Sequence, residues 1–435
     1  ANRTKKQKII ITLSELIKLK KSCEVRISVS DKGGEFVVMK SNLDDELVKK
    51  HLENRAIYQL TDDLTRKAEK DIHEAWEYVA KKNRVNGRHI ARLKSTRSIV
   101  LFCIYSHTNF QTTPYFQSKV RPIISGWGGP AVKISWFIQK KCTCTSATVC
   151  KSTCKNTGQI LQKLRKIQNG ELNNKFLFSL EVVSLHPSVD NDAAFDTPRM
   201  YLGKEKNNIE LFQFSISDII LLTKTIFQSN CFSWKRAYYE QRHGLPMGDR
   251  LASILAIPYM DRIENQAIYS DRSVSLYRYI DDCITPASSF EDALNIQNVL
   301  NAQDPSIQFE IELPDEDGFL PFLSTKIKVN DNGTVEIGWY AKPANKGLML
   351  NVNSHHPEQI KKAAIVNTIT TYEAICSTDY LLEEAERSFE DRATRNGYKK
   401  EYIETLKRKK TTTRNRPKEN SQTTLYHTIH FKKLY

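Results

Sequence analysis

The chain has little glycine or proline and no apolar run long enough to cross a membrane. Its 435 residues include only 16 Gly and 14 Pro, which excludes collagen-like and low-complexity chains. No apolar stretch reaches the roughly 20 residues that a transmembrane helix needs, so no membrane partner is expected. The first residues lack a secretory signal, and Ala1 in place of an initiator Met suggests a processed or excised chain.

The remaining composition favours a folded, basic protein. Hydrophobic residues make up 40% of the chain and charged residues 26%, enough for a sizeable core in two or three domains. The formal net charge is +15, from 65 Lys and Arg against 50 Asp and Glu. This excess favours a polyanionic partner, and nucleic acid is the leading one. An anionic membrane surface fits less well, and charge that serves only solubility is the plain alternative.

Four of the nine cysteines are clustered. They form a C-x-C-x5-C-x3-C pattern at Cys142, Cys144, Cys150 and Cys154. Four thiols could bind zinc, but common zinc sites space their ligands differently. Reduced cysteines in a loop are the favoured interpretation, and zinc is the alternative.

Hydrophobic periodicity predicts a mixture of helices and strands. Helices are expected over 41–95, 208–230, 249–270 and 288–303, and from 357 onward. A Cys- and Lys-rich connection followed by a helix is expected over 140–175. Strands are expected at 25–40 around a turn, 98–105, 119–125, 175–185, 274–280, 283–285, 307–313, 320–329 and 334–343. The Asn332-Gly333 pair predicts a hairpin between the last two strands.

Two acidic positions stand out because they lie in apolar strand patterns. Asp281 and Asp282 lie between two β-like runs, and Glu181 lies within FLFSLEVVSL. Buried carboxylates are costly unless a cation compensates, and divalent metals are held by oxygen ligands. If the two strands are neighbours in one sheet, the acids converge into a two-metal site for phosphoryl transfer. A plain hairpin turn at Asp281-Asp282 and a solvent-facing edge position for Glu181 are the alternatives.

The order of these segments resembles that of reverse transcriptases. FSLEVVSLHPSV resembles their motif A, QRHGLPMGDRLASILAIPYMDRIE their motif B, and YRYIDDCI their motif C. The chain is more similar to Penelope-like retroelement reverse transcriptases, relatives of telomerase. The segments that carry this similarity are DKGGEFVVM, KVRPIISGWGGP, LPFLSTKIKV, WYAKPANKGLMLNVNSHHP and RNGYKKEYI. The resemblance covers roughly residues 25–405.

This resemblance implies an α+β fold with the right-hand polymerase architecture of fingers, palm and helical thumb. It divides the chain into four parts. These are an N-terminal extension with the DKGG segment (1–95), the fingers and palm (96–340), the thumb (341–410) and a basic tail (411–435). It implies RNA-directed DNA polymerase activity by two-metal nucleotidyl transfer to a primer 3′-hydroxyl. Two Mg²⁺ or Mn²⁺ ions would be the cofactors. The implied catalytic residues are Glu181, Asp281 and Asp282, which would bind the metals together with the backbone carbonyl of Val182.

The resemblance also implies contacts with substrates. Lys119 and Arg121 would clamp the deoxynucleoside triphosphate, and His186 occupies the position of the residue that tests the sugar. The loop would approach the nucleotide and the template base through Gly244, Leu245, Pro246, Met247 and Gly248. The RNA template and DNA primer would meet a further set of residues: Tyr279, Lys342, His355, Lys361 and Lys362.

Several positions depart from the family pattern. Glu181 stands where the family has aspartate, and its extra methylene moves the carboxylate by roughly 1 Å, which can cost about 10²-fold in rate. Asp249 replaces a serine, Ser324 replaces an aspartate, and Pro258 should kink the motif B helix. The alternative function is therefore a catalytically impaired relic that only binds nucleic acid. A different basic protein with accidental motifs is the remaining possibility.

The sequence leaves other questions open. It shows no GIY-YIG endonuclease motif, which many Penelope-like proteins carry after the thumb. A nuclear location is expected from the function and the basic tail, with the cytoplasm as the alternative. The template RNA, the priming site, protein partners and the oligomeric state cannot be derived from the sequence.

Overall fold

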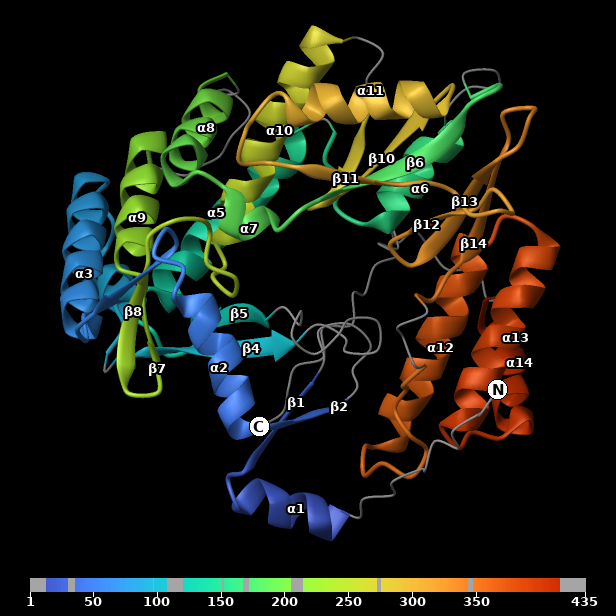
Figure 1. Ribbon diagram of the computed structural model, residues 1–435, viewed down its shortest axis with the longest axis horizontal. Coiled ribbons are helices and arrows are strands. Elements are labelled where there is room, and N and C mark those ends of the chain that lie inside the picture. The colour runs from blue at the N-terminus through green and yellow to red at the C-terminus, as the bar shows by residue number, and fades with distance from the viewer. Residues whose placement is uncertain are drawn as a thin grey trace, which may run out of the picture. The chain divides into compact units, whose positions relative to one another are not determined.

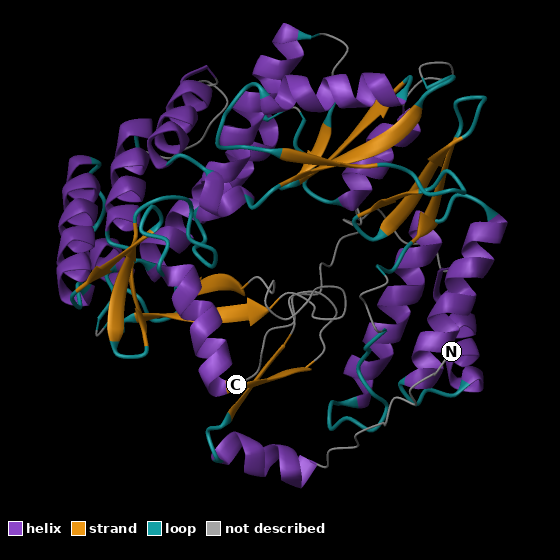
Figure 2. Ribbon diagram, in the orientation of Figure 1, coloured by secondary structure: helices purple, strands orange, loops and turns teal. Residues whose placement is uncertain are grey.

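A computed structural model describes residues 13–29, 36–96, 98–107, 120–150, 152–166, 172–204, 214–271, 275–342 and 347–414. Helices and strands alternate through most of the chain (Figure 2). Backbone contacts divide it into two compact units, Ala1–Lys346 and Gly347–Tyr435. Among the described helices, none is long and apolar enough to span a membrane.

A four-stranded antiparallel sheet carries the predicted acidic residues. Its strand order is β11-β6-β10-β9, with bounds Phe309–Glu312, Phe176–Val182, Asp282–Ala287 and Tyr277–Tyr279. Side chains alternate across a strand, so Phe178, Leu180 and Val182 share one face of β6 and Glu181 lies on the other. The first three are buried and Glu181 is exposed. The sheet therefore has one face in the core and an open face at the end of β6.

Helices cover the buried face of this sheet (Figure 1). The main core joins Leu180 and Cys283 of the sheet to Tyr259 and Ile263 of α10 and Ile296 of α11. The described helices of the first unit after residue 130 are α5 (Val132–Val149), α6 (Thr157–Lys166), α7 (Leu185–Ser188), α8 (Asn191–Lys204), α9 (Ile216–Gln228), α10 (Ala252–Ser270) and α11 (Phe290–Asn301). This core fixes the strands on which Glu181 and Asp282 stand.

A five-stranded sheet is a separate part of the first unit. Its order is β3-β8-β7-β4-β5, with bounds Tyr58–Thr61, Ala237–Gln241, Cys231–Trp234, Leu101–His107 and Val120–Ser125. Only β4 and β7 pair in parallel. Other elements of the N-terminal part are α1 (Leu13–Lys21), the hairpin β1 (Val25–Val29) and β2 (Phe36–Lys40), α2 (Ser41–Leu52), α3 (Thr65–Lys82) and α4 (Gly87–Leu93). Tyr58 of β3 and Phe232 of β7 join α2 in a smaller core.

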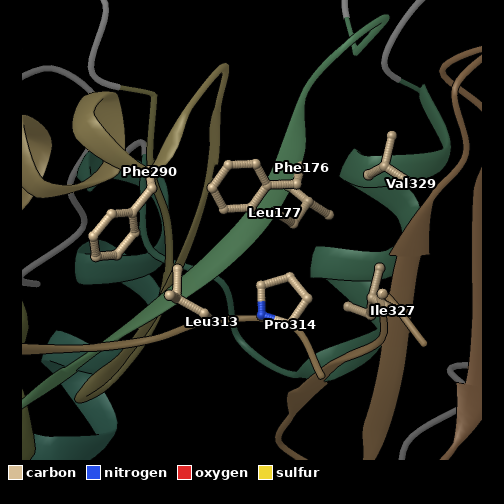
Figure 3. A pocket seen from close by; sticks show the side chains of 8 residues that line it. Phe176, Leu177, Phe290, Leu313, Pro314, Ile327 and Val329 are labelled. Atoms are coloured by element: carbon tan, nitrogen blue, oxygen red, sulfur yellow. The ribbon is translucent and has the colours of Figure 1, made fainter. Parts of the chain in front are cut away.

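A three-stranded sheet completes the first unit. It consists of β12 (Leu320–Phe322), β13 (Thr325–Val329) and β14 (Val335–Trp339). The hairpin predicted at Asn332-Gly333 is confirmed, because β13 and β14 pair antiparallel and Gly333 has a φ of +76°. An apolar pocket of about 370 Å³ lies between β13 and the first residues of β6 (Figure 3). None of the predicted site residues lines it.

The second unit is helical. It contains α12 (Glu358–Ile375), α13 (Asp379–Arg395) and α14 (Lys400–Arg414), which Figure 1 shows in orange and red. Ile365, Ile369 and Tyr372 of α12, Phe389 of α13 and Ile403 of α14 are fully buried. Their spacing of three or four residues gives each helix one apolar face. The predicted helical region from 357 is confirmed.

Some predicted elements were wrong. The region 41–95 is not wholly helical, because β3 pairs with β8 in its middle. The Cys-rich connection from 140 is instead the second half of α5, which runs to Val149. Strands β7 and β8 and helix α8 had no counterpart in the sequence patterns. Helix α10 contains Pro258 in its interior, and the kink expected there stays a prediction.

Candidate active site

Backbone pairing brings the predicted catalytic acids together. Glu181 on β6 lies directly opposite Asp282 on β10, and the Val182 N–H donates to the Asp281 carbonyl at 3.0 Å. Opposite residues of an antiparallel pair project to the same face. Glu181 is exposed, and both aspartates are half-buried. Two carboxylates therefore project from adjacent strands, and Asp281 occupies the turn beside them.

A third carboxylate extends this row and was not predicted. Glu310 on β11 lies opposite Glu181 on its other side, so it shares the face with Glu181 and Asp282. The alternation in the strand pattern at 307–313 is the signal that could have placed it. Within the described part of the chain, no three His, Cys, Asp or Glu side chains lie close enough to hold a metal ion together. The row supplies carboxylate oxygens without forming a preassembled three-ligand site.

The turn that carries Asp281 has an unusual backbone. Tyr279 pairs with Asp282, which leaves Ile280 and Asp281 as a two-residue turn. Ile280 has a φ of +58°, in the left-handed region that β-branched residues rarely adopt. Such conformations persist where the surrounding structure imposes them, and they cluster at functional sites. Tyr279, predicted to meet the primer, is half-buried at this hairpin.

His186 lies beside the acids on the short helix α7. Its carbonyl accepts the Leu245 N–H at 2.7 Å, which joins motif A to the Gly-Leu-Pro-Met-Gly loop. Burial lowers the pKa of His186, and the negative charge of Asp281 opposes this shift. The imidazole is therefore neutral near pH 7 and lies within electrostatic range of Asp281.

Glycines allow the Gly244–Gly248 loop to touch two other segments. Gly244 has a φ of +78°, and a Cβ there would lie 2.6 Å from the Pro187 Cα. Gly248 has a φ of +107°, and its Cβ would lie 2.3 Å from the Ile124 carbonyl oxygen. The Ile124 N–H in turn donates to the Met247 carbonyl at 2.7 Å. The loop thus bridges motif A and strand β5, with Leu245 and Pro246 buried.

Arg121 stands on the strand that this loop contacts. It is exposed on β5, three residues before Ile124. Lys119, its predicted partner at the triphosphate, lies outside the described residues. The geometry therefore places one of the two predicted cations on a strand adjoining the Gly244–Gly248 loop.

Asp249, which stands where the sequence comparison expected a serine, forms a hydrogen bond with the nearby backbone. Its carboxylate accepts the Leu251 N–H at 2.7 Å just before α10 begins. The carboxyl is half-buried, and burial raises its pKa, opposed by that hydrogen bond and by Arg250. Asp249 therefore acts as a turn residue at the entry of the helix.

The predicted nucleic-acid residues of the second unit differ in exposure. His355 and Lys362 are exposed, whereas Lys361 is only 9% exposed. The Lys361 ammonium donates to the Val352 carbonyl at 2.6 Å. Lys361 therefore anchors the segment before α12. Lys342, in the first unit, is exposed.

Two of the four clustered cysteines have side chains within the described part of the chain. Cys150 and Cys154 are buried free thiols, and burial raises the pKa of Cys150 to about 12. Cys142 and Cys144 belong to α5, and their side chains lie outside the described residues. Their assignment to a loop was wrong.

Comparison with known proteins gives one family match within the second unit and structural matches over almost the whole chain. A family model described as an animal helix-turn-helix domain matches residues 348–408, within the second unit. A search of curated proteins finds none that matches the sequence. Solved structures, in contrast, resemble almost the whole chain.

Two of these structures are yeast telomerases. Telomerase from Candida albicans, in complex with a fragment of telomeric RNA, has a TM-score of 0.57 at 9% identity. Apo telomerase from Candida tropicalis has a TM-score of 0.51, also at 9% identity. Each alignment covers 92% of this chain and 68% of the telomerase chain. At this identity the likeness concerns the fold, and it confirms the predicted α+β right-hand polymerase fold.

Proposed function

We propose that this chain is an RNA-directed DNA polymerase of the Penelope-like retroelement kind. The observation that carries the proposal is the pairing of Glu181 with Asp282 beside the Asp281 turn, on the open face of the sheet. The Gly244–Gly248 loop adjoins this site through Leu245 and the His186 carbonyl. Three ordered sequence motifs thus meet in one place, and the polymerase fold supports the same interpretation.

The donor set suits a hard divalent cation. Carboxylate oxygens are the ligands that Mg²⁺ prefers, and it commonly needs only one or two of them beside water and substrate phosphates. The absence of three converging side chains among the described residues is compatible with that preference. Glu181, Asp281, Asp282 and the Val182 carbonyl would hold two Mg²⁺ or Mn²⁺ ions. When bound, these ions neutralise charge that develops on the phosphoryl group.

The other residues orient the substrates. Lys119 and Arg121 bind the triphosphate, for which a guanidinium has matching geometry. Neutral His186 tests the sugar, and the Gly244–Gly248 backbone approaches the nucleotide and the template base. Tyr279 packs at the primer end. Lys342 in the first unit and His355 and Lys362 in the second contact the RNA template and DNA primer. Lys361 anchors the segment before α12. We expect the chain to act in the nucleus, with the cytoplasm as the alternative.

A catalytically impaired relic is the second candidate. Glu181 favours it, because the longer side chain shifts the carboxylate by roughly 1 Å. In this case the chain binds nucleic acid without extending a primer.

Primer extension tests the proposal. The native chain is given a DNA primer on an RNA template with deoxynucleotides, in Mg²⁺ and separately in Mn²⁺, and then with ribonucleotides. We expect deoxynucleotide extension that Asp281→Ala abolishes. The control Glu316→Gln removes one exposed negative charge outside the site and should extend normally. No extension by the native chain with either metal, or unchanged extension by Asp281→Ala, would contradict the assignment.

A further inference from the structure

A buried arginine lies next to the turn that carries the predicted catalytic aspartates. Arg278 on β9 is fully buried, and its guanidinium forms an ion pair with Glu264 of α10, which is equally buried. A buried charge of this kind is costly unless it is paired and hydrogen-bonded. The sequence patterns gave no sign of it, because Arg278 lies between two tyrosines in an ordinary strand pattern. Its position, three residues before Asp281, calls for an explanation.

The guanidinium contacts three segments at once: α10, the turn and segment 152–154. Besides Glu264, it donates to the Ile280 carbonyl at 3.1 Å, to Thr153 Oγ1 at 2.8 Å and to the Ile257 carbonyl at 3.1 Å. The planar fork of an arginine can serve several acceptors in fixed directions, whereas a lysine ammonium cannot. One side chain therefore ties the turn to α10 and to the segment 152–154.

Backbone bonds hold that segment against the outer edge of β9. The Arg278 N–H donates to the Ser152 carbonyl at 3.0 Å, and the Cys154 N–H donates to the Arg278 carbonyl at 2.7 Å. The Ser152 hydroxyl in turn donates to Glu264, the partner of Arg278. Segment 152–154 thus pairs with the outer edge of β9, and its Thr153 hydroxyl is one of the acceptors around the guanidinium.

The contact with Ile280 has the most direct bearing on the site. Ile280 precedes Asp281 and holds a φ of +58°, a conformation that must be imposed from outside. The hydrogen bond from Arg278 to the Ile280 carbonyl acts on the peptide unit that joins Ile280 to Asp281. The buried guanidinium is therefore positioned to orient the peptide group before Asp281, and with it the Asp281 backbone.

We infer that Arg278 is a positioning residue for the catalytic turn, held in place by Glu264 and segment 152–154. This inference rests on the proposed polymerase function for its effect on rate, but its structural part stands on the contacts above. Arg278 does not touch substrate. It acts through Ile280 on Asp281, so its loss should lower kcat while KM for the nucleotide stays nearly unchanged.

Two variants separate positioning from mere stability. Arg278→Lys keeps the positive charge but removes the planar guanidinium that serves several acceptors at once. In the double variant Arg278→Met/Glu264→Met an apolar pair replaces the ion pair, an exchange that is often neutral or stabilising. A matched control is Arg262→Met, because Arg262 lies on α10, as Glu264 does, and pairs with a carboxylate, Asp304, at 3.0 Å. The contacts of Arg262 within the described part of the chain are with Asp304 and the Tyr259 ring, and none is with the turn.

The measurements are the unfolding midpoint, amide hydrogen exchange in residues 275–287, and single-nucleotide incorporation. We expect both Arg278 variants to fold, to exchange faster at the turn, and to lose about 10²-fold in kcat. The control should match the native chain in exchange at the turn and in kcat. A double variant with native exchange and native kcat would overturn the inference. If the native chain incorporates no nucleotide, the proposed function fails, and hydrogen exchange at the turn alone decides the role of Arg278.

Discussion

Gly244 shows how single residues set the geometry of the site. Its left-handed backbone and its approach to Pro187 both exclude a side chain. Gly87, the first residue of α4, is a contrast, because a Cβ there would meet nothing within 4 Å. We therefore expect alanine to be tolerated at Gly87 and not at Gly244.

We predict that Gly244→Ala destabilises the protein by at least about 1–3 kcal/mol, the cost of a strained backbone, with the clash at Pro187 in addition. Gly87→Ala, the matched control, should change the free energy of unfolding by less than about 1 kcal/mol. Denaturant titration of both variants measures this. Equal effects would show that the loop relaxes away from Pro187.

At the level of elements, helix α9 is tied to α3 by one buried carboxylate. Asp218 is part of the capping box with Ser215 and accepts hydrogen bonds from Lys82 at 2.7 Å and Asn83 at 3.0 Å. Burial alone would raise the pKa of Asp218, but these hydrogen bonds outweigh it and lower the pKa to about 2. The charged carboxylate therefore stabilises the folded state.

The lowered pKa of Asp218 predicts that the free energy of unfolding depends on pH. The folded pKa lies below the ordinary value of 3.8, so the stabilisation is complete above that value and is lost as pH falls through about 2. Asp218→Asn should lose about 2 kcal/mol of stability at pH 7 and flatten the stability profile between pH 4 and 2. Urea unfolding across this range measures it, with exposed Asp196→Asn as the control. A profile as steep as the native one would rule out Asp218 as the source.

Elements differed in how far the sequence could predict them. Hairpin β13–β14 was predictable because Asn332-Gly333 specifies its turn locally. Strand β3 was not, because four residues within a helical pattern are held as a strand only by pairing with β8, some 180 residues later. Helix α5 was missed because its cysteines resemble a loop cluster, although its apolar residues Ile134 and Ile138 pack in the core.

The site was predictable to a similar extent. Glu181 and Asp281 could be found because an acid in an apolar strand is conspicuous. Glu310 lay in an ordinary alternating strand, and the importance of Arg278 depends on contacts with three separate segments. Lys361 and Lys362 are neighbours in sequence, and only the fold shows that the first is anchored and the second is exposed.

For the whole molecule, the net charge of +15 predicts salt-sensitive binding to nucleic acid. Affinity for an RNA–DNA hybrid should fall steeply with salt, and Lys362→Gln should reduce the slope of log K against log salt by about 1. Lys361→Met should leave the slope unchanged and lower the unfolding midpoint, because its ammonium is bonded to Val352. Fluorescence anisotropy at several salt concentrations checks this. Equal slopes for the native chain and Lys362→Gln would remove Lys362 from the contact surface.

The most direct test of the catalytic site is single-nucleotide incorporation by the native chain, Glu181→Asp and Asp281→Ala on one RNA template. Hybrid binding by each variant serves as the control for folding. We predict incorporation by the native chain, and a loss of at least about 10²-fold in Asp281→Ala with hybrid binding retained. Incorporation by Asp281→Ala at the native rate would contradict the assignment of the site. A silent native chain beside an active Glu181→Asp would show that one methylene disables an otherwise intact polymerase.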